Sequence, residues 1–292
     1  MRKSPTVIGY LIVFTGALAF AGNNVLAVFT FESGITPLTL VAWRMVFAFI
    51  ALGLIIKIFG LAIHLPKRER NAALGLGILN GSIAFCLMSA FNHIAVGLAV
   101  LVFYFYPILT GIGAWLSGQE KLNIGVVIGL FGGFSGLAIA LEFAGNSANS
   151  TGILFASLAA VLMALTALLS ARILKTDNAQ SVTLHIHLSG SVIFVIISLV
   201  VGDFSLPQTN LGWVGFISVA VLYTVAVATF FAGIAHIGPV RASLVMNLEP
   251  VGSIVLGFIL LGQVLSPQQI LGAVIVIAAV TTVKWFGHNK KA

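Results

Sequence analysis

The chain has 292 residues, of which 60% are hydrophobic and only 7% are charged. An ordinary soluble domain carries about 25% charged residues, so the composition excludes that class. The formal net charge of +7 would suit a protein that binds nucleic acid. The placement of the charges, described below, argues against nucleic acid as a partner.

Ten long apolar segments account for nearly the whole chain. Each approaches the ~20 residues that an α-helix needs to cross ~30 Å of hydrocarbon. The links between them are short and leave no room for an extramembrane domain with its own chemistry. We therefore expect an all-α membrane protein with ten transmembrane helices in a lipid bilayer. The segments are residues 7–29, 37–58, 71–91, 95–117, 123–142, 151–173, 181–202, 211–234, 239–261 and 267–286.

The first segment resembles a cleavable signal peptide, because Arg2 and Lys3 precede an apolar run that contains residues 19–21, Ala-Phe-Ala. Cleavage there would leave four segments in one half of the chain and five in the other. We interpret this segment as a retained first helix.

The Lys and Arg residues outside the segments all fall on one side of the membrane if the N-terminus is cytoplasmic. The opposite loops contain Glu32, Glu142 and Asp203 and neither Lys nor Arg. A cytoplasmic excess of Lys and Arg in short loops sets the orientation of membrane proteins. The basic charge is therefore explained by topology, and we expect a multi-pass protein of the cytoplasmic (inner) membrane with both termini in the cytoplasm.

A short pattern occurs twice, 143 residues apart and without a gap. His93 recurs as His236 and Pro107 as Pro250, and Leu122 and Gly129 recur in the same register. Each copy contains five segments, so the second copy must cross the membrane in the opposite sense. Inverted repeats are typical of secondary transporters, whose substrate sites lie near the bilayer midplane. We predict a first repeat over residues 1–143 and a second over residues 144–292, which begins in a small polar linker.

Proline and glycine mark special positions inside the segments. Pro107 and Pro250 lie in the interior of their segments, where proline kinks a helix, and we expect them to act as hinges. The fifth segment has glycines at positions 129, 132, 133 and 136, spaced so that helix backbones can approach closely. Packing within the chain and a homodimer contact are both open uses of these glycines.

Two charged residues, Arg44 and Glu249, lie deep inside segments, and intramembrane charges are candidates for function. At 1.5 Å per residue Arg44 lies about 10 Å beyond Pro37, and Glu249 about 12 Å beyond Arg241. The repeat pairs Arg44 with His187 and Glu249 with Tyr106, so Tyr106-Pro107 and Glu249-Pro250 should face each other. A buried ion pair that locks helices together remains the structural alternative.

We expect an amphipathic cavity for a substrate with an apolar body and a polar or zwitterionic head. Its flanking residues are Phe103, Tyr104, Phe105 and Tyr106 on one side and Asn247 and Glu249 on the other. Asn23 and Asn24 in the first segment could line the same cavity with Arg44, or could instead hydrogen-bond to other helices. The expected substrate-binding residues are Asn23, Asn24, Arg44, Phe103, Tyr106, Asn247 and Glu249.

No cofactor or metal site is predicted, and the chain is not expected to be an enzyme. His185 and His187 are two residues apart and point to different faces of a helix, so they cannot easily share an ion. Glu249 is the only acid deep in a segment, which leaves too few groups for acid–base catalysis. The single cysteine, Cys86, excludes an internal disulfide.

Several motifs resemble those of EamA-type carriers of the drug/metabolite transporter superfamily over the whole chain. The resemblance implies ten helices, cytoplasmic termini, and often export of amino acids, related metabolites or drugs. Gln263 stands where glutamate is usual, whereas Glu120 keeps the acid in the first repeat. Lysines that hold phosphate in related carriers are absent mid-segment, which disfavours polyanionic cargo. The motifs are Asn247-Leu-Glu-Pro-Val251 with Gly257, Gly262-Gln263, Pro267 and Gly272; Tyr106-Pro107 with Trp115, Gly118-Gln-Glu120 and Gly129; Trp43-Arg44; and Gly22-Asn23-Asn24.

The sequence therefore predicts a secondary transporter, an exporter of small amphipathic metabolites such as amino acids, that works by alternating access. Glu249 is expected to bind an amino group of the substrate or to exchange a proton during transport. A channel or a non-transporting membrane sensor is the alternative, and an intramembrane enzyme is a more distant one.

Overall fold

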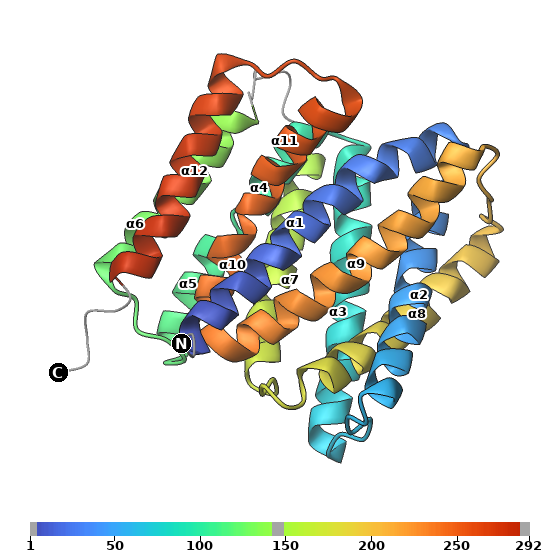
Figure 1. The fold of residues 1–292 in the computed structure, drawn as a ribbon, viewed down its shortest axis with the longest axis horizontal. Helices are drawn as coiled ribbons and strands as arrows, with labels where there is room; N and C mark the ends of the chain where they lie inside the picture. The colour runs from blue at the N-terminus through green and yellow to red at the C-terminus, as the bar shows by residue number, and fades with distance from the viewer. Residues whose placement is uncertain (1–4, 142–148, 287–292) are drawn as a thin grey trace. The chain divides into compact units, whose positions relative to one another are not determined.

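The computed structural model describes residues 5–141 and 149–286, and these residues form twelve α-helices (Figure 1). The twelve helices correspond to the ten predicted segments, since the fourth segment is divided into α4 and α5 and the ninth into α10 and α11. The helices are α1 (Pro5–Glu32), α2 (Pro37–Ile58), α3 (Lys67–Phe91), α4 (Val96–Phe103), α5 (Tyr106–Leu116), α6 (Ile124–Ala140), α7 (Ser150–Ala171), α8 (Ala179–Val201), α9 (Asn210–Ile237), α10 (Pro239–Met246), α11 (Leu248–Leu261) and α12 (Pro267–Phe286).

The predicted all-α membrane fold is confirmed. Within the described residues, eight spans are long and apolar enough to cross a membrane, and the fifth and tenth are shorter apolar helices. Helix α6 has 17 residues, about 26 Å at 1.5 Å per residue, which is at the short end for a transmembrane helix. The predicted boundary between residues 143 and 144 lies outside the described residues, as do both chain ends.

Local hydrogen bonds explain where several helices begin and end. The Thr36 hydroxyl caps α2 by accepting the Thr39 N–H at 3.2 Å, and Asn123 caps α6 by accepting the Val126 N–H at 2.9 Å. These side chains satisfy N–H groups that lack a partner in the first turn. Helices α8 and α11 end at Gly202 and Gly262, whose φ angles of 72° and 66° favour glycine.

The two divided spans break four residues before their prolines. Pro107 has no N–H to donate to the carbonyl of Phe103, and α4 ends at Phe103. Pro250 likewise deprives the carbonyl of Met246 of its partner, and α10 ends at Met246. The sequence predicts kinks at the prolines. The structure places a short turn just before each proline, which then lies in the first turn of the next helix.

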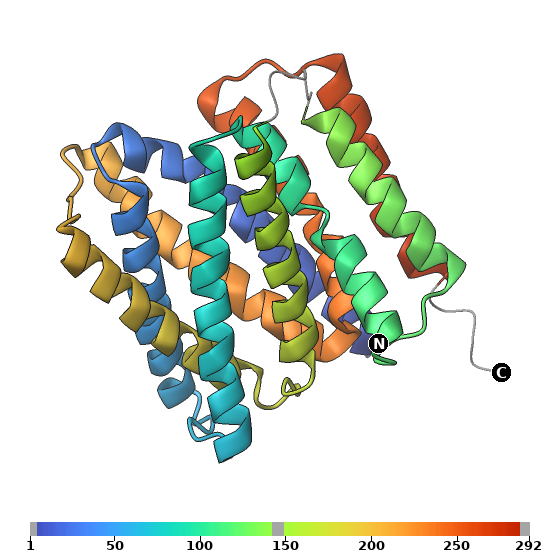
Figure 2. The ribbon, with the colours of Figure 1, turned by 180° about the vertical axis from the view of Figure 1, so that it is seen from behind.

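The chain divides into two compact units, each with helices from both predicted repeats. The first unit comprises Met1–Gly81 and Arg172–His236, and the second comprises Ser82–Ala171 and Ile237–Ala292. In the first unit α2 packs against α8, and the Ser189 hydroxyl of α8 donates to the Leu74 carbonyl of α3 at 2.8 Å. In the second unit α7 lies beside the C-terminal part of α3, with Ala159 against Ile83 and Cys86 (Figure 2).

Helices α6 and α12 form the closest pair in the second unit and lie side by side in both views (Figures 1 and 2). A methyl group added to Gly136 would lie 2.9 Å from the Gly272 carbonyl oxygen and 2.9 Å from the Val276 nitrogen. One added to Gly132 would lie 3.2 Å from the Ala279 Cβ. Two of the predicted small-residue positions thus serve close helix packing within the chain.

Candidate functional site

Glu249, in the first turn of α11, is the charged centre of a polar cluster in the second unit. The Tyr104 hydroxyl donates a hydrogen bond to the Glu249 carboxyl group, and Tyr106 is close enough to interact with it electrostatically. Both tyrosines are buried, with exposed fractions of 4% and 2%, whereas Glu249 is partly exposed. The repeat-equivalent residues Tyr106 and Glu249 are therefore neighbours, as the sequence register predicts.

Three aromatic rings from the α4–α5 turn contact one another beside this carboxyl group. The ring centroid of Phe103 lies 5.6 Å from that of Tyr104 and 5.3 Å from that of Tyr106, and the two tyrosine centroids are 5.9 Å apart. The broken helix gathers the rings, because Phe103 ends α4 and Tyr106 begins α5. Aromatic faces attract cations, and a carboxylate neutralises a cation's charge. Three rings beside a carboxyl group therefore suit an ammonium group.

Asn247 forms the break between α10 and α11 and packs against α6. Its side chain is 1% exposed and lies so close to the Gly133 backbone that a methyl group there would be 2.6 Å from Nδ2. No described residue provides a hydrogen-bond partner for its Oδ1 atom. A buried amide oxygen without a donor costs free energy, so Asn247 offers an acceptor to a bound group.

Arg44 belongs to a second polar cluster, in the first unit. Its guanidinium carbon lies 4.6 Å from the centre of the Tyr223 ring, in cation–π contact. The Tyr223 hydroxyl lies 3.2 Å from His187 Nε2, and His187 Nδ1 lies 2.8 Å from the Thr183 carbonyl oxygen. The repeat-equivalent residues Arg44 and His187 thus contact the same tyrosine.

The backbone fixes the tautomer of the neutral His187 ring in this cluster. Because the Thr183 carbonyl can only accept, Nδ1 of His187 must carry the proton of the neutral ring. Nε2 then accepts a hydrogen bond from the Tyr223 hydroxyl. The cluster therefore carries its positive charge on Arg44.

Asn23 and Trp43 support the same unit through contacts with α9. In the amide orientation that satisfies both of its polar atoms, Asn23 donates to the Val219 carbonyl at 3.3 Å and accepts from the Asn24 backbone N–H at 3.2 Å. Trp43 stacks on Phe216 at 5.0 Å and donates to its carbonyl oxygen at 3.2 Å. For Asn23, these contacts favour the helix–helix role that the sequence left open.

The structure thus groups the predicted binding residues by unit. Asn23, Asn24 and Arg44 lie in the first unit, and Phe103, Tyr106, Asn247 and Glu249 lie in the second. From the sequence, Tyr104 is expected beside the cavity, although not among the binding residues, and Gly133 and Tyr223 are missed. Repeat register relates Tyr104 to the Glu249 cluster, because Tyr104 is equivalent to Asn247. Tyr223 is equivalent to Asn80, which gives no such signal. Among the described residues, no group of three His, Cys, Asp or Glu side chains could hold a metal ion.

Glu120 lies outside the membrane-spanning segments and caps α10. Its Oε1 atom accepts the Val240 N–H at 3.3 Å. Burial raises the pKa of Glu120, while the Val240 N–H and the charge of Arg241 act in the opposite direction. Gln263, its counterpart in the second repeat, lies instead against Gly257, where an added methyl group would be 2.5 Å from its Oε1. Glu120 of the first repeat therefore caps a helix, whereas its counterpart Gln263 in the second repeat has a different neighbour.

Known proteins are similar to this chain in sequence and in fold. A model of the EamA-like transporter family matches residues 7–141 and again residues 150–285. The uncharacterized transporter YyaM of Bacillus subtilis (strain 168) is 28% identical over 283 residues, which cover 92% of this chain and 90% of the relative. The uncharacterized transporter YvbV of the same organism is 27% identical over 224 residues, covering 74% and 72%. One crystal structure, 19% identical, has the same fold with a TM-score of 0.81 over 98% of this chain and 99% of its own. With both halves of the sequence matched by one family model, the chain belongs to the EamA-like transporter family.

Proposed function

We propose that this transporter exports small amphipathic metabolites, such as amino acids and related compounds, across the cytoplasmic membrane by alternating access. The observation that carries the substrate class is the Glu249 carboxyl group held by Tyr104 beside two further aromatic rings. An ammonium group is the common cation that such a cluster would recognise.

In this proposal the amino group of the substrate binds Glu249 and takes a place beside the rings of Phe103 and Tyr106. Asn247 accepts a second hydrogen bond from the same ammonium group through its Oδ1 atom. The carboxylate must then give up part of its interaction with Tyr104, so binding exchanges one hydrogen bond for a charge-assisted one. A proton could occupy Glu249 when the substrate is absent.

The first unit has a formal positive charge of its own, on Arg44. Arg44 keeps its guanidinium over the Tyr223 ring, and its N–H groups suit a carboxylate in planar geometry. A zwitterionic metabolite carries both an ammonium and a carboxylate group. Arg44 and Glu249 are the formal charges deep inside the predicted segments, and a pair of opposite charges favours amino acids over purely cationic or purely anionic solutes.

The broken helices support alternating access. Inverted-repeat transporters commonly bind substrate at discontinuous helices and move one bundle against the other. In this chain the turns at Tyr104–Phe105 and at Asn247 interrupt the backbone hydrogen bonding next to the proposed binding residues. We propose that these turns flex during transport, with Pro107 and Pro250 preventing them from closing into regular helix.

Counterflow in proteoliposomes tests the function. A comparison of metabolites in cells that lack or overproduce the protein first selects the amino acids to test. Vesicles containing purified protein are then loaded with one unlabelled amino acid and diluted into its labelled form. We expect transient, saturable accumulation of at least one amino acid or close derivative. Uptake without counterflow would indicate a channel, and the absence of any flux over the whole panel would reject this substrate class.

A further inference from the structure

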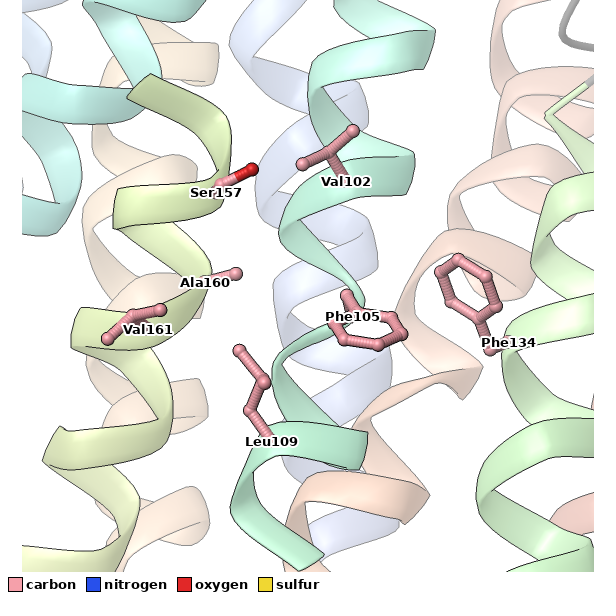
Figure 3. A pocket seen from close by; sticks show the side chains of 7 residues that line it. All are labelled: Val102, Phe105, Leu109, Phe134, Ser157, Ala160 and Val161. Atoms are coloured by element: carbon pink, nitrogen blue, oxygen red, sulfur yellow. The ribbon is translucent and has the colours of Figure 1, made fainter. Parts of the chain in front are cut away.

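The second unit contains an apolar pocket of about 370 Å³ that the proposed binding residues do not use (Figure 3). The Phe105 and Phe134 rings meet edge to face, with centroids 5.4 Å apart and planes at 78°. Residues of α7 form the opposite wall. The lining residues are Val102, Phe105, Leu109, Phe134, Ser157, Ala160 and Val161.

The pocket lies near the middle of each span that contributes to it. Tyr106 is the central residue of the span Val96–Leu116, and the centre of α7 falls between residues 160 and 161. Every lining residue is within four positions of the middle of its own helix or span. At 1.5 Å per residue the lining therefore stays within about 6 Å of the midplane.

The chemistry of the pocket matches that depth. Among the described residues that line the pocket, only Ser157 has a polar side chain and none is charged. Phe105 and Val161 are 38% and 43% exposed, so the pocket opens to the surface of the protein. For a membrane-spanning segment this surface meets lipid, and at the midplane lipid offers only hydrocarbon tails.

We propose that the acyl chain of a membrane lipid occupies this pocket. Hydrocarbon tails are as apolar as the lining, so the hydrophobic effect contributes little to binding. An empty pocket would instead lose the dispersion contacts of its walls, and an acyl chain restores them. The occupant is therefore a loosely held, exchangeable tail whose headgroup remains at the membrane surface.

Through Phe105, the bound acyl chain contacts the turn between α4 and α5. Phe105 lies between Tyr104 and Tyr106 in the turn that gathers the aromatic rings. A tail that packs on Phe105 supports this turn from the face opposite to the buried tyrosines. The acyl-chain site stands on the pocket alone and does not depend on the proposed substrate.

Photocrosslinking tests the site in proteoliposomes that contain a phospholipid with a diazirine near the end of one acyl chain. Crosslinked residues are mapped by mass spectrometry. We expect Phe105 and Val161 to be labelled severalfold more than Phe131 and Val192, which are 57% and 50% exposed outside the pocket. Equal labelling of all four positions would overturn the proposal, because it would reflect general contact with lipid.

Filling the pocket provides the matched variant. Ala160→Phe should reduce labelling of Phe105 severalfold, and Leu158→Phe, a neighbouring lipid-facing change, should leave it unaltered. Ala160 is buried and Val161 lies at the exposed rim, so Val161→Phe serves as a second filling variant that disturbs the packed core less. Size-exclusion profiles and melting temperatures monitor the folding of both variants. Unchanged labelling of Phe105 in folded filling variants would contradict the proposal.

Discussion

At the scale of single residues, the polar groups inside the membrane are arranged by hydrogen bonds that leave little freedom. His187 is held in one tautomer by the Thr183 carbonyl, and this makes Tyr223 the donor to its Nε2 atom. The same tyrosine ring receives the charge of Arg44. Tyr223 therefore carries two separable interactions, one through its hydroxyl group and one through its ring.

Tyr223→Phe should separate these interactions. The ring and the cation–π contact remain, but His187 keeps a buried Nε2 acceptor without its donor, which typically costs about 1–3 kcal/mol. We expect a lower melting temperature in detergent, and a larger loss for Tyr223→Leu. A double-mutant cycle with His187→Phe measures the coupling. Additive losses would show that the hydroxyl of Tyr223 and His187 do not interact.

At the scale of helices, the α4–α5 and α10–α11 breaks follow from the missing proline N–H groups. Pro107→Ala and Pro250→Ala restore a donor to the carbonyls of Phe103 and Met246. We expect these variants to fold at least as stably as the parent and to transport several times more slowly. Pro37→Ala is the matched control, because Pro37 occupies the first turn of α2, where its N–H is not needed. Transport at the parental rate by both variants would contradict a flexing role for the breaks.

The start of α10 depends on Glu120, whose pKa is raised by burial. A carboxyl group with a raised folded-state pKa stabilises the fold at pH below its unfolded value, and that contribution is lost as pH rises through the folded pKa. Glu120→Gln keeps an acceptor for the Val240 N–H without the buried charge. We expect its melting temperature to exceed that of the parent at pH 8, with the advantage shrinking toward pH 4. A constant difference across this pH range would mean that the pKa of Glu120 is the same in the folded and unfolded states.

The sequence predicts the positions of the helices better than it predicts the side-chain contacts between them. Long apolar segments set the ten spans, and Pro107 and Pro250 locate the breaks to within one helical turn. Repeat register predicts that Tyr106 and Glu249 meet and relates Arg44 to His187. The contacts of Tyr223 with Arg44 and of Asn247 with Gly133 depend on tertiary packing. No spacing along the chain encodes them.

At the scale of the whole molecule, the chain is a multi-pass transporter whose orientation remains a prediction from its charges. The loops assigned outside contain no Lys or Arg, and such a bias places the opposite face in the cytoplasm. Reporter fusions at Asn149 should therefore read external, and fusions at Lys291, beyond the described residues, should read internal. An external C-terminus would remove the basis for an inverted second repeat.

The central claim is that Glu249 binds the amino group of the substrate, and Glu249→Gln tests it most directly. Glutamine keeps the size of the side chain but removes its charge, and a hydrogen bond to a charged group is worth about 1.5–3 kcal/mol, roughly 10- to 100-fold in affinity. Purified Glu249→Gln should fold, lose this much affinity for the amino acid identified by counterflow, and transport it poorly. Glu32→Gln, a change in an exposed acid, should behave like the parent. Parental affinity, transport and pH dependence in Glu249→Gln would contradict the account and leave Glu249 a structural residue.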